Sequence, residues 1–122
     1  MELNYLKKEI KVLERSIFKS LNIYEEENEI PSHNGRASKK VEVRHPLPFA
    51  SYVDGVVKNI EGLISSLIFE TDKDIIMGLS EVQHSLLSIQ NIEGKDYYLD
   101  LRKKIFKNLE TINNLESLIE GK

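Results

Sequence analysis

Three histidines, His33, His45 and His84, are the side chains of this sequence best suited to metal binding or acid-base chemistry. Glu81 stands three positions before His84, which is the Glu-x-x-His spacing of carboxylate-metal sites in helical bundles. A di-iron bundle carries this motif on two of its helices, whereas here Glu42 and His45 repeat the spacing only in a segment expected to be a loop. We therefore expect no metal site, and we expect Glu81 and His84 on the solvent side of a helix.

Other catalytic patterns are missing from the sequence. Its 122 residues include no cysteine, which excludes disulfides, thiolate zinc sites and cysteine nucleophiles. Phosphate-binding loops, Gly-x-Ser-x-Gly elbows and His-Glu-x-x-His pairs are absent as well. HEPN ribonucleases use an arginine and a histidine a few residues apart, but Arg44 and His45 are adjacent here. No catalytic site and no cofactor are expected. An enzyme of metal-dependent or ribonuclease type using His45 or His84 ranks third among the possible functions, after protein binding and nucleic-acid binding.

A basic segment, residues 28–47, lies between two apolar patterns. Connections this long are uncommon in small domains and are often functional. Asn34-Gly35 is a favoured tight-turn pair, and Val41-Glu42-Val43 alternates as a strand does, so a β-hairpin-like arm is plausible here. The arm either folds back on the acidic run 25–29 or reaches a partner. Its cations are Arg36, Lys39, Lys40 and Arg44.

Some large apolar residues fall outside the periodic pattern that the rest of the chain follows: Val12, Phe18, Leu99 and Phe106. Leu99 and Phe106 are seven residues apart and therefore share a helix face. Such residues either are buried by irregular packing or form an apolar patch for a partner or a second copy of the chain. We predict a partner-binding surface that combines three of them with the cations of the arm: Phe18, Leu99, Phe106, Arg36, Lys39, Lys40 and Arg44.

A second basic cluster supports nucleic-acid binding as the first alternative. It consists of Arg102, Lys103, Lys104 and Lys107, and the N-terminal pattern adds Lys7, Lys8, Lys11, Arg15 and Lys19. Cations on one face would bind phosphates in a salt-sensitive manner without sequence specificity. The net charge of -3 and the scarcity of aromatics among these cations make nucleic-acid binding less favoured than protein binding.

Apolar residues at a three-four spacing predict four helices that position these side chains. The four seams run from Leu6 to Tyr24, from Phe49 to Leu67, from Ile75 to Ile89 and from Tyr98 to Ile119. Two short connections and one long one join them. The sequence therefore predicts an all-α fold, a four-helix bundle that forms a single domain over residues 1–122.

The expected helix boundaries follow from a few residues. Extending the second seam would bury acidic residues, so the chain must break near Thr71. Pro48 suits the first turn of the second helix. Gly94 suits the end of the third helix in a left-handed conformation, and Asp96 suits the N-cap of the fourth.

One polar residue interrupts the last seam, because Asn108 stands between Ile105 and Ile112. A buried asparagine selects register in coiled coils at some cost in stability. In the alternative, a small rotation gives the core position to Leu109 and leaves Asn108 at the edge. We favour this alternative.

The composition is that of an ordinary soluble domain, with 40% hydrophobic and 30% charged residues. The sequence has no signal-peptide pattern, and no stretch approaches the roughly 20 apolar residues of a membrane span. Without cysteines, the cytoplasm is the expected compartment. Ala37 and Ala50 are the only alanines, while isoleucine, lysine and asparagine are frequent. This bias is typical of AT-rich bacterial or phage genes.

These features favour a non-enzymatic protein-interaction module: a small accessory subunit, an adaptor or an inhibitor. The expected partner is another protein, and a second copy of the chain is a further alternative. Binding would use the apolar and basic helical surface together with the arm.

The assigned register makes Ile60 a core residue of the second helix. We expect Ile60→Ala to lower the free energy of unfolding by between about 2 and 5 kcal/mol, because truncation removes buried methyl groups and leaves a cavity. Thermal unfolding followed by circular dichroism measures this loss. A melting temperature close to that of the unmodified chain would contradict the register.

Overall fold

The computed structural model describes residues 3–30, 47–67 and 73–121, and most of these residues are helical. The four helices are α1 (Leu3–Glu27), α2 (Phe49–Leu67), α3 (Lys73–Ile89) and α4 (Tyr98–Glu120). This part of the chain contains no strand, which confirms the predicted all-α four-helix fold. The proposed hairpin-like arm lies outside the described residues.

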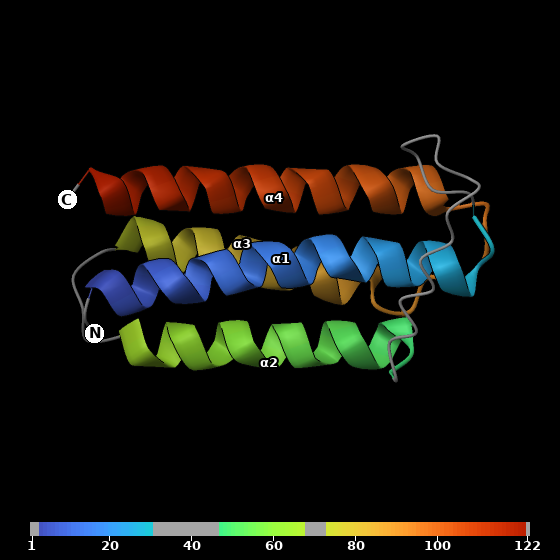
Figure 1. Ribbon diagram of the computed structural model, residues 1–122, viewed down its shortest axis with the longest axis horizontal. Coiled ribbons are helices and arrows are strands. Elements are labelled where there is room, and N and C mark those ends of the chain that lie inside the picture. The colour runs from blue at the N-terminus through green and yellow to red at the C-terminus, as the bar shows by residue number, and fades with distance from the viewer. Residues whose placement is uncertain (1–2, 31–46, 68–72, 122) are drawn as a thin grey trace.

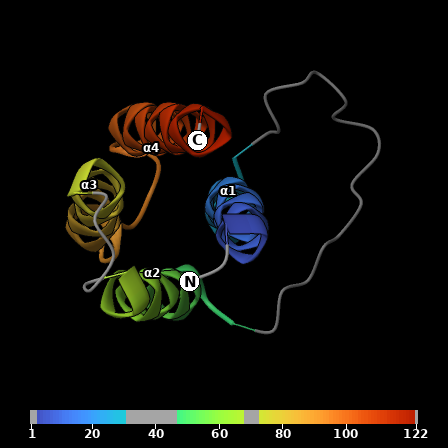
Figure 2. The same ribbon diagram turned by 90° about the vertical axis from the view of Figure 1, so that its left-hand side faces the viewer.

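The helices stand at the corners of a square and alternate in direction (Figures 1 and 2). α1 contacts α2 and α4, and α3 contacts the same two helices, so the pairs α1/α3 and α2/α4 are diagonal. The start of α1 and the end of α4 consequently lie at the same end of the bundle (Figure 1). α1 and α4, the helices furthest apart in the sequence, pack side by side.

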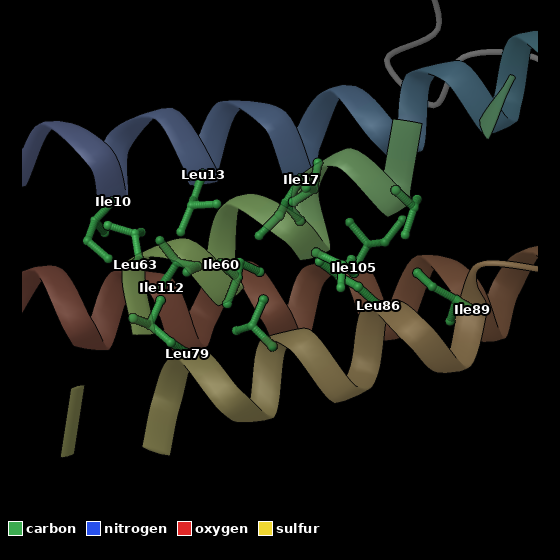
Figure 3. Packing of buried hydrophobic residues seen from close by; sticks show 14 of the residues in the cluster. Ile10, Leu13, Ile17, Ile60, Leu63, Leu79, Leu86, Ile89, Ile105 and Ile112 are labelled. Carbon is green, nitrogen blue, oxygen red and sulfur yellow. The ribbon is translucent and has the colours of Figure 1, made fainter. Parts of the chain in front are cut away.

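One hydrophobic core fills the space between the helices. Figure 3 shows side chains from all four helices pointing into the same interior, among them Ile17, Ile60, Leu86 and Ile105. Ile60 is completely buried, as its seam position requires. The apolar seams predicted from the spacing are the buried faces of the helices. Because isoleucine and valine are mediocre helix formers, burial of these faces stabilises the helices.

Asn108 belongs to the core, which contradicts the favoured prediction. It is only 4% exposed, whereas Leu109 is half-buried. Ile105 and Ile112 fix the rotation of α4, and Asn108 lies on the same stripe. Rotating α4 to bury Leu109 would turn these isoleucines away from the interior. The amide nitrogen of Asn108 consequently has no hydrogen-bond partner among the described residues.

A polar cluster ties the end of α1 to the connection between α3 and α4. The Tyr24 hydroxyl donates to the carbonyl oxygen of Gly94 at 2.5 Å, and the Gly94 N–H donates to Asn28 Oδ1 at 2.9 Å. Gly94 has a φ of 87°, a conformation that glycine adopts without strain. The Tyr98 hydroxyl donates to the buried carboxylate of Glu25. Burial, followed by this carboxylate, raises the pKa of Tyr98 to about 12.

Two boundary predictions need correction. Gly94 does have a left-handed backbone, but α3 ends earlier, at Ile89, so the glycine shapes the connection and not the helix end. Asp96 is not the N-cap of α4, because Tyr97 holds that position without a side-chain hydrogen bond. Pro48 does precede α2 directly, and its carbonyl oxygen accepts the Tyr52 N–H at 2.9 Å.

Part of the acidic run 25–29 has a structural role. Glu25 is buried against Tyr98, as described above. Glu27 Oε1 accepts the N–H of Phe49 at 2.8 Å and so caps the first turn of α2. Of the carboxylates proposed to neutralise the arm, these two are therefore already engaged within the bundle.

The end of α1 places a glutamate in a conformation that favours glycine. Glu29 has a φ of 54°. Its N–H donates to the carbonyl oxygen of Glu26 at 3.2 Å, and the N–H of Ile30 donates to that of Glu25 at 2.8 Å. This pair of bonds is a Schellman motif, in which glycine is the usual left-handed residue.

We expect Glu29→Gly to raise the free energy of unfolding by about 1 kcal/mol, because it relieves the left-handed strain of a residue with a Cβ. Glu26→Gly is the matched control: it removes the same charge from a helical position and should lower stability by a similar amount. Urea unfolding of both variants measures the difference. Equal effects of the two substitutions would contradict the assigned turn.

Candidate functional site

An open groove of about 830 Å³ lies between α1 and α4. Phe18 follows the buried Ile17, and Phe106 follows the buried Ile105. Each residue turns a helix by about 100°, so both rings point away from the core toward the flank where α1 and α4 meet. The groove is lined by Lys11, Glu14, Arg15, Phe18, Lys19, Asn22, Phe106, Leu109, Glu110 and Asn113.

The groove brings together two of the four apolar residues that fall outside the periodic pattern. Phe18 is 47% exposed and Phe106 is 41% exposed, and both line it. Leu99 is 66% exposed and does not line it. Val12 is also exposed outside the groove. The irregular packing proposed as an alternative therefore does not bury these side chains within the described part of the chain.

A smaller groove of about 510 Å³ continues along α4. It shares Phe106 and Glu110 with the α1/α4 groove, so the two form one continuous surface. Three of the four cations predicted for nucleic-acid binding, Arg102, Lys103 and Lys107, line this part. Lys104 is exposed but lines neither groove.

Arg102 lies against Phe106 at the junction of the two grooves. Its guanidinium carbon is 4.8 Å from the centroid of the Phe106 ring, a distance at which a cation and an aromatic face attract each other. The Nε of Arg102 is buried and has no hydrogen-bond partner within the described residues. The guanidinium is thus held by the ring and not by a carboxylate.

One charged cluster bridges α1 and α4 beside the groove. Lys11 Nζ lies 2.9 Å from Glu116 Oε2 and 3.4 Å from Glu14 Oε2. A hydrogen bond to Glu116, followed by burial, raises the pKa of Glu14. Burial pushes the pKa of Glu116 upward, but its hydrogen bonds with Glu14 and Lys11 outweigh burial and hold that pKa below the usual value. The two carboxyl groups therefore share one proton and one negative charge. The ammonium of Lys11 favours the negative charge on Glu116.

Sequence reasoning missed several residues of the site. Leu109 was expected in the core, and Glu14 and Glu116 carried no local signal because 101 positions separate them in the sequence. Only the antiparallel register of α1 against α4 brings such distant side chains together. Glu110, Asn22 and Asn113 were missed for the same reason.

The other residues considered for metal binding, catalysis or partner binding form no site in the described part of the chain. Glu81 and His84 are exposed on α3, as the spacing predicted. The described residues contain no group of three or more potential metal ligands. The remaining predicted residues lie outside the described residues: His33, Arg36, Lys39, Lys40, Arg44 and His45.

Comparison with known proteins adds no relative, since no family model, no curated protein and no solved structure matches the chain. Among the described helices, none combines the length and the apolar character needed to cross a membrane.

The Glu14 and Glu116 pair generates a pH-dependent prediction. Because the pKa of Glu14 is raised in the folded chain, ionised Glu14 opposes folding, and stability is lost as pH rises above the ordinary glutamate pKa of 4.5. We expect Glu14→Gln to raise stability by about 1 kcal/mol at neutral pH, because an amide can donate to Glu116 without repelling it. The gain should disappear in acid.

Glu110→Gln is the control, because it removes a carboxylate from the same groove without a described carboxyl partner. Urea unfolding at neutral and at acidic pH compares the two variants. The same stability change for both at neutral pH would contradict the shared-charge arrangement.

Proposed function

We propose that the chain is a non-enzymatic protein-interaction module that binds another protein through the α1/α4 groove. One observation carries the proposal: Phe18 and Phe106, from the two helices furthest apart in sequence, line one groove and remain almost half exposed. Such a module would act as an accessory subunit, an adaptor or an inhibitor. Composition and the lack of cysteine support a cytoplasmic protein of bacterial or phage origin.

The exposed area of the two rings is large enough to anchor a partner. A phenylalanine side chain can bury roughly 200 Å², so covering the exposed part of both rings removes about 180 Å² of apolar surface from water. At about 25 cal/mol per Å², this contributes roughly 4 kcal/mol. Aromatic residues in the centre of an interface commonly supply contributions of this size. Neighbouring contacts must supply the rest, because association itself costs free energy.

Nucleic-acid binding is the second candidate. It is favoured by the continuity of the surface, which places Arg15 of α1 on the same side as the cations of α4, whereas the Lys19 ammonium lies 6.0 Å from the centroid of the Tyr52 ring on α2. Glu14 and Glu110 line the same grooves and would repel phosphates. The apolar floor between them, formed by Phe18, Phe106 and Leu109, also offers phosphates no compensating hydrogen bonds. No observation favours the third alternative, an enzyme that uses His45 or His84.

A display library of helical peptides tests the proposal. Its apolar positions vary among leucine, isoleucine, phenylalanine and methionine, and its flanking positions vary among acidic, basic and neutral residues. We expect peptides selected on the intact chain to bind at least tenfold more weakly after Phe18→Asp combined with Phe106→Glu, because an apolar stripe cannot desolvate the new charges.

Met77→Glu combined with Leu87→Glu is the matched control, because it changes two exposed apolar residues on α3, the helix diagonal to α1. Binding to this variant should be unchanged, and circular dichroism should show all variants folded. Failure to select any peptide, or binding that is lost only in the α3 variant, would overturn the proposed function.

A further inference from the structure

We infer that the occupant of the α1/α4 groove is an acidic amphipathic helix, a segment with an apolar stripe flanked by carboxylates. The inference rests on the proposed function and specifies the chemistry of the partner. Three properties of the groove lead to it: its linear shape, its apolar floor and its excess of unpaired cations.

The groove suits a helix because it is lined by residues of two helices, α1 and α4, which run antiparallel (Figure 1). On α1 its lining extends from Lys11 to Asn22 and on α4 from Phe106 to Asn113, and the smaller groove, lined by α4 alone, continues toward Arg102. At 1.5 Å per residue, the α1 wall is roughly 16 Å long and the α4 wall roughly 10 Å, or roughly 18 Å with the smaller groove. A helix of about three turns matches this length, and a third helix packed on a helix pair is a common recognition mode.

The apolar floor fixes the face that the occupant must present. Phe18 contributes from α1, and Leu109 and Phe106 contribute from α4. Leu109 is half-buried at the edge of the core, so the floor continues the packing of the bundle outward. Residues at positions i, i+3 or i+4, and i+7 of a helix present a stripe of matching length.

The charge of the groove determines which residues should flank the apolar stripe of the bound helix. The two grooves are lined by six cations and two carboxylates, an excess of four positive charges on a chain whose net charge is -3. Lys11 is already paired with Glu116. Within the described part of the chain, no carboxylate lies within ion-pair distance of Arg15, Arg102, Lys103 or Lys107. Carboxylates of a partner would complement these unpaired cations.

Arg102 is the best positioned of these cations. Phe106 holds its guanidinium at 4.8 Å, so little rotamer freedom is lost when an anion binds. Its Nε is buried, so a partner would be bound through the two terminal nitrogens of the guanidinium. A partner carboxylate would accept a pair of hydrogen bonds from these nitrogens while the apolar stripe covers the ring.

The same charges argue against the other occupants. A symmetric dimer through this groove would place the same excess of positive charge on both sides of its interface. A nucleic acid would complement the cations but would leave the apolar floor unmatched. A protein helix with acidic flanks is the occupant that satisfies both the floor and the cations.

The flanking positions of the selected peptides test this inference separately from the proposed function. We expect glutamate and aspartate to be enriched over lysine and arginine at the flanks. One selected acidic peptide is then synthesised together with its charge-reversed form, in which every acidic residue is lysine. Fluorescence anisotropy should show binding at least about tenfold weaker for the charge-reversed peptide.

Substitutions on α4 test which cations bind the acidic peptide. Arg102→Ala should weaken binding of the acidic peptide about tenfold, as expected for loss of a charge-assisted hydrogen-bond pair. Lys104→Ala is the matched control, because it removes a cation from the same helix outside both grooves, and it should leave the affinity unchanged.

The outcomes separate the two proposals. Selected peptides that require Phe18 and Phe106 but show no acidic enrichment would overturn the inference and leave the proposed function standing. Equal losses for Arg102→Ala and Lys104→Ala would also overturn it, because they would indicate a diffuse attraction. Tight, salt-sensitive binding of a single-stranded oligonucleotide, with no groove-dependent peptide, would overturn both. A chain that sediments as a dimer and does not release its second copy to the acidic peptide would overturn the inference.

Discussion

The structure depends on the limited width of the stripe that each helix can present to the interior of a four-helix bundle. On α1 and α4, residues such as Ile17 and Ile105 fill this stripe completely. At these two positions the residue next in sequence is turned by about 100° and lies outside the buried stripe. Phe18 and Phe106 are therefore excluded from the core by the same residues that stabilise the helices. The groove between α1 and α4 is a direct result of this exclusion.

The rotation of α4 couples the core to the groove. It buries Asn108, whose amide nitrogen lacks a partner among the described residues, and it leaves the more apolar Leu109 half outside. Stability alone would favour the opposite choice at these two positions, because an unsatisfied buried amide costs free energy. The isoleucine stripe prevents that choice, and Leu109 becomes part of the groove floor. One polar residue in the core and one apolar residue in the groove are thus two results of the same helix rotation.

Local spacing predicted the four seams, the break between α2 and α3, and the position of Phe18 and Phe106 outside the seams, because each depends on the helical repeat alone. It did not predict the contacts between Tyr98 and Glu25 or between Lys11 and Glu116, since their partners are distant in sequence and meet only through the register of the bundle. The position of Asn108 was predicted wrongly because a preference for apolar cores was weighted above the phase of the flanking isoleucines. The two aromatic residues of the groove could be recognised in the sequence as apolar positions outside the seams. The charged residues that line the groove could be identified only from the structure.

The central claim is that the bundle does not need the two groove phenylalanines for its stability. Urea unfolding of the double variant Phe18→Ala and Phe106→Ala, compared with Phe49→Ala in the core, tests it most directly. The account predicts a loss of about 2 kcal/mol or less for the pair, since nearly half of each ring is exposed and no internal cavity forms. It predicts a loss of about 3 to 5 kcal/mol for the buried Phe49 alone. A double variant at least as destabilised as Phe49→Ala would contradict the account, because the two rings would then belong to the core.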